Sequence, residues 1–198
     1  MNAFQWLYSD VVKDHFVNPR NVFDPDEGFK ADAEGVVGNI KCGDQMMFLL
    51  KIKDDLIEDV RWKTYGCASA IASTSMLSES VKGMGIREAY RIKPSDIAAK
   101  LGGLPENKIH CSVLGDKALR AAIDQYLEKQ GRKGEFKGED AVVICTCLNI
   151  TDKDIEEAVK AGARDWQKLQ EATKIGTVCG GCKSKAEELL HEFVHIYS

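Results

Sequence analysis

The spacing of apolar residues predicts a helix followed by strands in the first part of the chain. Apolar residues recur every three or four positions over 4–16, and Asn18-Pro19 ends this pattern because the residue before a proline avoids helical backbone. Turn-forming and acidic residues over 22–35 indicate irregular structure. Strands are expected over 36–37, 46–52 and 56–65. Apolar and charged residues alternate in the last of these, which indicates an antiparallel sheet with one wet face.

Helical spacing replaces the strand pattern after Cys67. A helix of small residues is expected from there to Gly83, since a glycine is typical of a helix end. Further helices are expected over 86–101, in two short pieces, and over 112–130. Because the strands come first and the helices follow, the fold class is α+β, in a first domain spanning residues 1–130.

A charged, glycine-rich segment at residues 131–141 has the composition of a linker. A second, smaller and mainly helical domain is expected beyond it, over 142–198. Thr151 and Asp154 have the spacing of a capping box, which predicts the start of a helix. The helices expected in this part cover 155–160, 165–173 and a final stretch from Lys183. So small a domain is marginally stable alone, and a bound metal group would supply the missing stability.

Charge and composition exclude several classes of protein. The net charge of −4 provides no basic surface for nucleic acid. The sequence has no signal-peptide pattern and no run of about 18 apolar residues, so we expect a cytoplasmic protein without a membrane partner. In a reducing compartment, the seven cysteines are expected to be metal ligands or reactive thiols rather than disulfide partners.

Four of the cysteines form two close pairs near the end of the chain. Cys145 and Cys147 enclose one residue, and Cys179 and Cys182 enclose two glycines. Two sulfurs on each of two loops can clamp a small inorganic core from opposite sides, which indicates an iron–sulfur cluster. Tetrahedral zinc is the main alternative, although zinc sites commonly use spacings of two to four residues in both pairs.

The other three cysteines are far apart in sequence but share a local context. Cys42, Cys67 and Cys111 each lie in a turn or at an expected helix start, where a thiolate is favoured. This context favours a metal or cluster site over ordinary core cysteines. A carboxylate or imidazole could add a hard, exchangeable ligand, so Asp44 and His110 are candidates.

One lysine near the first three cysteines and the remaining histidines of the chain are interpreted separately. Lys108 is a candidate for supporting the site, through an ion pair with a carboxylate or thiolate. The other histidines, His15, His191 and His195, have no ligand cluster nearby in sequence and are interpreted as structural or surface residues.

These residues form motifs that resemble those of a known family. The segments Lys41–Asp44, Thr64–Ser75 and Lys108–Leu114 resemble the three motifs of the NifU/IscU iron–sulfur scaffold family, and Tyr8–Asn21 is similar to its N-terminal segment. The last part of the chain resembles the [2Fe-2S] domain of NifU, which is itself similar to the bacterioferritin-associated ferredoxin. The resemblance implies an IscU-like domain, with a small antiparallel sheet packed against helices, followed by a small [2Fe-2S] domain.

The resemblance also implies a function, which is that of a carrier rather than an enzyme. Cys42, Cys67 and Cys111, with Asp44 and also His110, would hold a transient [2Fe-2S] or [4Fe-4S] cluster, or iron or zinc. A cysteine desulfurase of the NifS or IscS type would supply sulfur, and apo iron–sulfur proteins would receive the cluster. The ligands of a permanent [2Fe-2S] cluster with a redox role would be Cys145, Cys147, Cys179 and Cys182.

The sequence departs from the family in two places. Longer NifU proteins carry a third domain with another cysteine pair, which this sequence lacks. The chaperone-binding loop of IscU reads Leu-Pro-Pro-Val-Lys, whereas this sequence has Leu104–Lys108 with Glu and Asn in the centre. The different loop leaves recognition by a dedicated chaperone open. Formation of a homodimer is a separate question that these motifs do not address.

Three other functions remain as alternatives at this point. One is a ferredoxin-like electron carrier, in which only the last four cysteines matter. Another is a zinc-binding protein. A hydrolase or transferase is disfavoured, since the sequence has no H-E-x-x-H motif, nucleophile elbow or phosphate-binding glycine loop.

Overall fold

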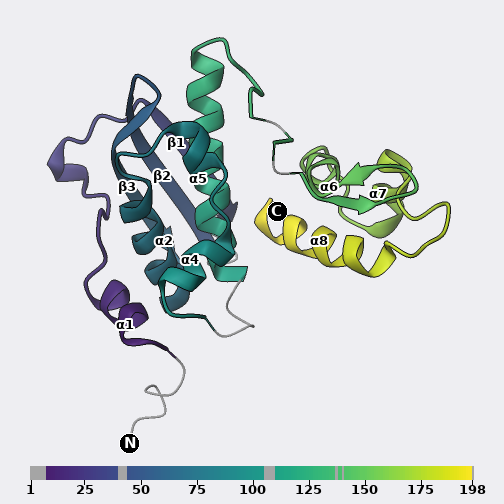
Figure 1. Cartoon of the computed structure of the whole chain (residues 1–198), viewed down its shortest axis with the longest axis horizontal. Helices are drawn as coiled ribbons and strands as arrows, with labels where there is room; N and C mark the ends of the chain where they lie inside the picture. The colour runs from purple at the N-terminus through teal and green to yellow at the C-terminus, as the bar shows by residue number, and fades with distance from the viewer. Residues whose placement is uncertain (1–7, 40–43, 105–109, 137, 140, 198) are drawn as a thin grey trace, which may run out of the picture. The chain divides into compact units, whose positions relative to one another are not determined.

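A computed structural model describes residues 8–39, 44–104, 110–136, 138–139 and 141–197 of the chain. The chain divides into two compact units, Met1–Phe136 and Lys137–Ser198, and each is described by itself (Figure 1). Within the described residues, no helix is both long and apolar enough to cross a membrane.

The first unit is built on a three-stranded antiparallel sheet. Its strands follow one another in space as in sequence: β1 (Ala33–Asn39), β2 (Asp44–Lys53) and β3 (Leu56–Tyr65). The turn between β2 and β3 has Asp54 and Asp55 at φ of 51° and 60°. Two positive φ angles in sequence make the tight turn whose twist matches that of the paired strands.

Helices α2 (Ala68–Val81) and α5 (His110–Lys129) cover one face of this sheet. The unit also contains α1 (Asp10–Val17), the 3₁₀ turn η2 (Pro25–Glu27), α3 (Ile86–Tyr90) and α4 (Pro94–Lys100). Figure 1 shows α2 and α5 lying across the sheet. Alternate residues of β2, Met46, Phe48 and Leu50, are fully buried beneath them. The α+β class predicted from the sequence is therefore confirmed.

The largest differences between the predicted and observed boundaries of the first unit lie in β1 and α1. Strand β3 covers the predicted residues, but β1 begins at Ala33, inside the segment that was expected to be irregular. The first helix begins at Asp10, because the Ser9 side chain caps it by accepting a hydrogen bond from the Val12 N–H at 3.1 Å. The part of the predicted helix over 4–7 lies outside the described residues.

The second unit consists of a small hairpin and three helices. The elements are β4 (Val143–Cys145), β5 (Ile150–Thr151), α6 (Asp152–Lys160), α7 (Trp166–Thr173) and α8 (Lys183–Ile196). The capping box is confirmed: Asp154 N–H donates to Thr151 Oγ1, and Thr151 N–H donates to Asp154 Oδ2. The sequence analysis expected no strands here, because a three-residue strand is too short to show a period.

The segment after α5 packs against the first unit instead of leaving it at once. Phe136 is 1% exposed, and its ring meets the edge of Tyr90 with centroids 5.4 Å apart. The Arg87 guanidinium lies 4.6 Å from the centre of the same ring. Arg132 donates to both carboxylate oxygens of Asp55 at 2.8 Å. Residues 131–136, which were expected to begin a linker, therefore belong to the first compact unit.

Candidate metal centres

The backbone brings several of the early candidate ligands to one end of the sheet. Asn39, the last residue of β1, pairs with Asp44, the first residue of β2, so Asp44 lies at that end. Strand β3 finishes at the same end, because Tyr65 pairs with Gln45. Cys67 follows directly as the N-cap residue of α2.

Helix α5 reaches the same end because it runs antiparallel to β1. Gln125 accepts a hydrogen bond from the Glu34 N–H, near the start of β1, and Gly35 packs between Ala118 and Ala122. Four residues of strand beyond Gly35 advance about 13 Å, and eight residues of helix before Ala118 advance about 12 Å. The first turn of α5, which contains Cys111, therefore lies level with the end of β1.

The structure describes some of the predicted ligands of this first centre in full, some by their backbone alone, and some not at all. Cys67 is described in full: it is partly buried, and its side chain makes no capping hydrogen bond at the start of α2. Asp44, His110 and Cys111 are placed by their backbone, as the first residue of β2 and the first two of α5. Cys42 and Lys108 lie outside the described residues. The ligand set of this centre stays a prediction.

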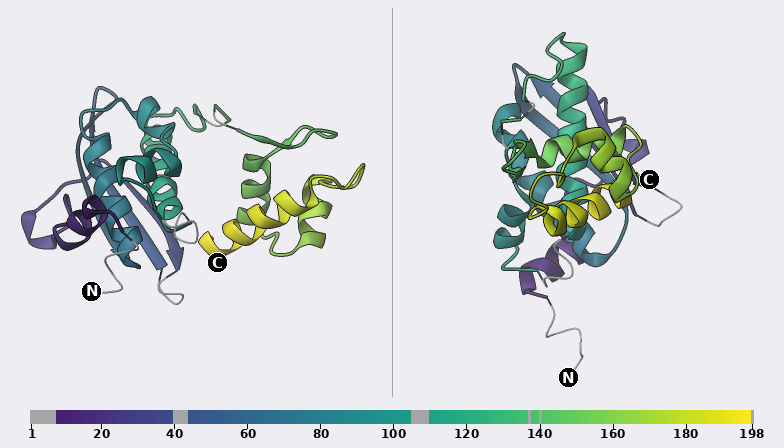
Figure 2. Two further views of the ribbon diagram at one scale, coloured as in Figure 1. Left: turned by 60° about the horizontal axis from the view of Figure 1, so that its bottom comes forward. Right: turned by 90° about the vertical axis from the view of Figure 1, so that its right-hand side faces the viewer.

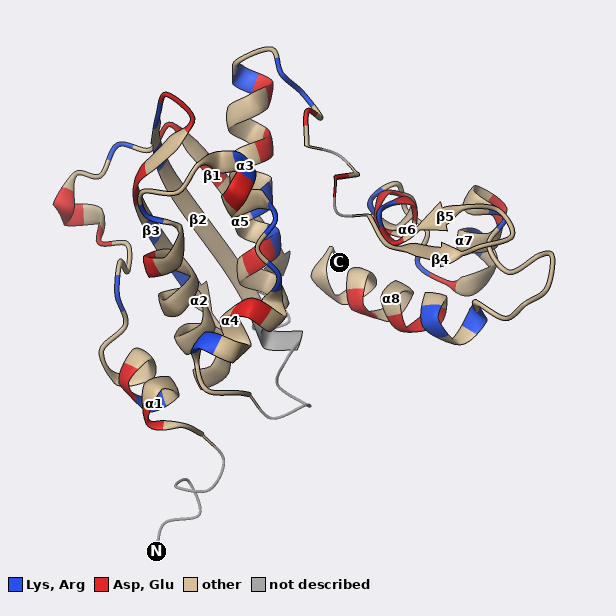
Figure 3. Cartoon of the chain, viewed as in Figure 1, with Lys and Arg blue, Asp and Glu red and all other residues tan. Residues whose placement is uncertain are grey.

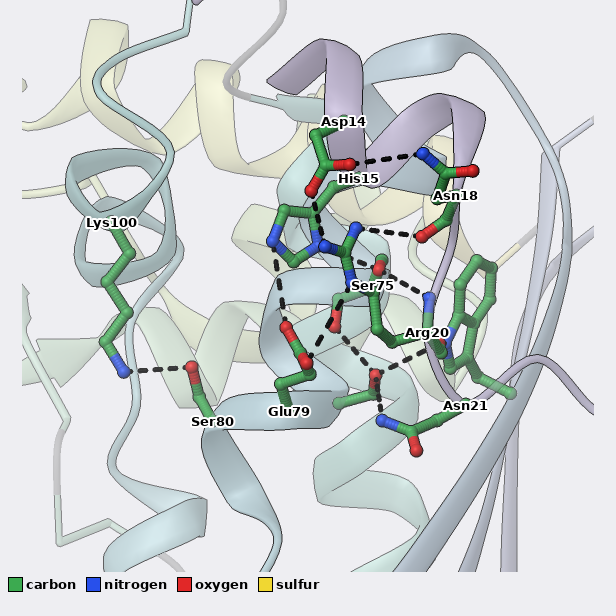
Figure 4. A network of polar contacts seen from close by, with 11 residues as sticks. Asp14, His15, Asn18, Arg20, Asn21, Ser75, Glu79, Ser80 and Lys100 are labelled. Carbon is green, nitrogen blue, oxygen red and sulfur yellow. Dashed lines mark hydrogen bonds and ion pairs between the residues drawn. The ribbon is translucent and has the colours of Figure 1, made fainter. Parts of the chain in front are cut away.

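A polar network fixes α2, and hence Cys67, against the N-terminal segment (Figure 4). His15 is 4% exposed, and its Nδ1 lies 2.8 Å from Ser75 Oγ. The same oxygen accepts the Arg20 N–H at 2.9 Å. His15 Nε2 lies 3.7 Å from a Glu79 carboxylate oxygen, and Arg20 also pairs with Asp14. The burial of His15 agrees with its interpretation as a structural or surface residue, whereas its partners, some 60 positions away, leave no local pattern in the sequence.

The network also determines the proton state of the buried imidazole. Burial lowers the pKa of His15, and the nearby Arg20 guanidinium lowers it further, whereas Glu79 and Asp14 act in the opposite direction. Burial is the largest effect because a charged imidazolium would lose its hydration. His15 is therefore held mainly neutral, with Ser75 as its partner at Nδ1.

The second candidate centre lies where two loops of the second unit meet. Cys145 ends β4, and Cys147 lies in the turn before β5. Cys179 lies in the loop between α7 and α8, and Cys182 is the N-cap residue of α8. In the left view of Figure 2, the hairpin turn (green) and the loop before α8 (yellow) lie together at one end of this unit.

The four sulfurs form two close pairs, each with one cysteine from each loop. Cys147 Sγ lies 3.4 Å from Cys179 Sγ, and Cys145 and Cys182 are close enough for each thiol to shift the pKa of the other. Within the described residues, no three His, Cys, Asp or Glu side chains are already arranged around a point that could hold one metal ion. The four cysteines are therefore arranged as two separate pairs, and each pair joins the two loops.

Backbone amides of the second loop stabilise one sulfur of each pair as a thiolate. The Gly176 N–H lowers the pKa of Cys145, and the Cys182 thiol adds to this effect. The Gly181 N–H, 3.5 Å from Cys179 Sγ, lowers the pKa of Cys179. Gly176 has a φ of 70°, a backbone conformation that favours glycine.

The remaining thiol of each pair keeps its proton more tightly. The neighbouring sulfur of Cys179 raises the pKa of Cys147, and burial raises the pKa of Cys182. Metal binding would displace the protons that these thiols keep. Four thiolate ligands in two loops, with amide donors directed at sulfur, fit the ligand chemistry of an iron–sulfur cluster.

Comparison with known proteins agrees with this division into two units. A family model described as the NifU-like N terminal domain matches residues 7–133, and one described as the BFD-like [2Fe-2S] binding domain matches residues 143–192. The chain is 49% identical over 127 residues to the iron-sulfur cluster assembly scaffold protein IscU of Escherichia coli, covering 64% of this chain and 98% of that protein.

Two further relatives match the chain over longer stretches. IscU 1 of Archaeoglobus fulgidus is 49% identical over 131 residues, covering 66% of this chain and 84% of the relative. The nitrogen fixation protein NifU of a Nostoc species is 36% identical over 194 residues, covering 94% of this chain. The chain spans 64% of the length of that NifU protein. With its first unit and most of its length matched in this way, the chain belongs to the NifU-like family of iron–sulfur scaffold proteins.

Proposed function

We propose that the chain is a scaffold for iron–sulfur cluster assembly, not an enzyme. In this proposal, the first unit receives sulfur from a cysteine desulfurase, combines it with iron, and passes the resulting cluster to apo-proteins. The observation that supports the proposal is that Asp44, Cys67 and the first turn of α5, which contains Cys111, lie at one end of the sheet. The names of the IscU and NifU relatives support the same role.

The two centres suit different lifetimes of the group that they hold. The proposed ligands of the transient cluster are Cys42, Cys67 and Cys111, with Asp44 and His110 as candidates for an exchangeable fourth position. A hard carboxylate or imidazole ligand is replaced more readily than a thiolate on iron. Lys108 is proposed to support this centre, which would hold a [2Fe-2S] or a [4Fe-4S] cluster.

The second unit is proposed to retain a [2Fe-2S] cluster, which supplies one-electron chemistry when bound. Cys145, Cys147, Cys179 and Cys182 would each contribute a thiolate, and the Gly176 and Gly181 amides would stabilise that negative charge. Two thiolates from each loop would hold both loops in place. Metal binding would therefore also stabilise the fold of this small unit.

The decisive experiment is cluster transfer from the full chain under anaerobic conditions. The protein is loaded with ferrous iron, cysteine, a cysteine desulfurase and dithiothreitol, which reduces the delivered sulfur to sulfide, and transfer to an apo-ferredoxin is followed by absorption. We expect one transferable and one retained cluster. Cys67→Ser should abolish transfer and keep the retained absorption, whereas Cys147→Ser should do the reverse.

The outcomes also separate the competing functions. An electron carrier would keep its full function in Cys67→Ser, and a zinc protein would be colourless and contain no iron. Absence of any transfer from the wild-type chain, with the acceptor shown to accept a cluster from another donor, would disprove the scaffold role.

A further inference from the structure

Apolar side chains surround the exposed edge of the second centre. Leu148 follows Cys147 and is 41% exposed, and Val178 precedes Cys179 and is 66% exposed. Both of these cysteines are themselves exposed. Exposed valine and leucine add nothing to the core of the unit, and beside a redox group they provide the dry contact that close approach of a partner needs.

Lysines adjoin these apolar residues on the same loop and helix. Lys183 and Lys185 lie in the first turn of α8, with side chains 55% and 64% exposed. From residue 172 to residue 186 the chain has three lysines and no acidic residue. The hairpin turn, residues 143–151, carries no charge at all. Among Lys, Arg, Asp and Glu, only lysines therefore surround the cysteines along these two segments, as Figure 3 shows for the start of α8.

Lys183 Nζ lies 5.6 Å from the centre of the Trp166 ring, but the position of both lysines in α8 is unfavourable for the helix itself. The start of a helix carries partial positive charge, so cations in the first turn are disfavoured. The nearest carboxylates, Glu187 and Glu188, lie one turn further from the cysteines, at 3.9 Å from Lys183 and 2.8 Å from Lys185. Exposed pairs of this kind are weak and leave the lysine charge available to a partner.

We propose that Leu148, Val178, Lys183 and Lys185, together called the cysteine rim, form the docking surface for an acidic one-electron redox protein. This inference rests on the proposed function of the second unit. Positive charge next to the exposed sulfurs would attract a negatively charged partner, and the two apolar side chains would exclude water at the centre of the contact. Such a surface is small, so the complex is transient.

The reaction that this surface would serve is a single electron transfer. A flavin partner in its anionic hydroquinone form would lose one electron and become the neutral semiquinone, without releasing a proton. The group held by the four thiolates would gain that electron. No bond forms or breaks between the two proteins, so docking needs only to bring the two groups close together.

The test uses the full chain with its retained cluster and a flavodoxin, a small acidic protein that carries one flavin mononucleotide. The second-order rate constant of reduction by flavodoxin hydroquinone is measured by stopped flow, and binding of oxidised flavodoxin is measured by NMR titration. We expect the rate constant to fall about tenfold or more between low and high ionic strength. In the double variant Lys183→Gln/Lys185→Gln, most of this salt dependence should be lost, and binding should weaken.

Matched variants separate the rim from general effects of charge and hydrophobicity. Lys133→Gln/Lys168→Gln removes two lysines of similar exposure elsewhere and should keep the wild-type salt dependence. Val178→Ser should weaken binding at high salt, whereas Val17→Ser, at a valine 70% exposed on α1, should not. Cluster content and midpoint potential are measured for every variant.

Each outcome decides the proposal. Equal rates and binding in the rim and control variants would overturn it. So would a rim variant that changes cluster retention or potential without changing the salt dependence, because the lysines would then act on the cluster alone. Loss of a dimer in the rim variant, seen by sedimentation, would assign the surface to a second copy of this chain instead. A wild-type chain that retains no cluster would refute the proposed function, which is a separate result.

Discussion

Replacing Gly35 by alanine should destabilise the first unit more than the same change at Gly85 or Gly115. A Cβ atom at position 35 would lie 2.1 Å from the Ala118 carbonyl oxygen and 2.4 Å from the Ala122 nitrogen. Both atoms belong to the backbone of α5, so no side-chain rotation can relieve the overlap. The backbone of Gly35 is not in the left-handed region, and the effect is therefore one of space alone.

The expected size follows from the geometry. Overpacking a core costs typically about 1–3 kcal/mol and occasionally more. The obstacle at Gly35 is a rigid helix, which must move away from β1 along with its packing, so we expect a loss of about 3 kcal/mol or more. A typical domain is stable by about 5–15 kcal/mol, and the loss is a large part of that. Cluster transfer should fall as well, because β1 and α5 both lead to the first centre.

The other two glycines provide a graded control. Gly85 has open space around its Cβ position and an ordinary φ of −65°, so Gly85→Ala should change stability by less than about 0.5 kcal/mol. Gly115, inside α5, would place its Cβ 3.3 Å from a Leu77 side-chain carbon. There the gain in helix propensity, about 1 kcal/mol, offsets the tight contact. Urea denaturation followed by circular dichroism measures all three, and a Gly35→Ala protein as stable as Gly85→Ala would refute the reasoning.

Three further predictions concern other parts of the chain. His15 has a pKa below its unfolded value of about 6.5, so the unfolded chain binds more protons and stability falls as the pH drops through this range. His15→Gln should flatten this dependence between about pH 7.5 and 5.5, whereas His191→Gln, at an exposed histidine, is the control variant. Phe136→Ala should cost about 3–5 kcal/mol in the melting of the first unit, and no effect would mean that residue 136 is linker. Asp44→Ala should slow cluster transfer to apo-ferredoxin, and equal or faster transfer would count against its ligand role.

The sequence predicted those features whose signal is local. Strand β3 was placed correctly, because its residues alternate between a wet and a dry face along the strand. The cysteine pairs at 145–147 and 179–182 were equally clear, since close spacing puts two sulfurs on one loop by itself. The capping box at Thr151 was visible for the same reason, as it needs only residues three positions apart.

Features that depend on distant residues were missed. Strand β1 begins with Ala33 and Gly35, which have too little side chain to show a strand pattern, and the small size of Gly35 is required by α5, far away in sequence. His15 looks like an isolated histidine until α2 supplies Ser75 and Glu79. The burial of Phe136 was hidden in a segment whose overall composition is that of a linker. The ligand set of the first centre stays a prediction, since Cys42 lies outside the described residues and Cys111 is placed by its backbone alone.

The contacts of α1 have a consequence for the order of folding. The sheet joins neighbouring strands through short connections, whereas the bond from His15 to Ser75 closes a loop of 60 residues. Contacts of large sequence separation carry a greater entropic cost and tend to form late. We therefore expect α1 to dock onto α2 after the folding transition state. Substitutions at His15 should then accelerate unfolding and leave the refolding rate nearly unchanged.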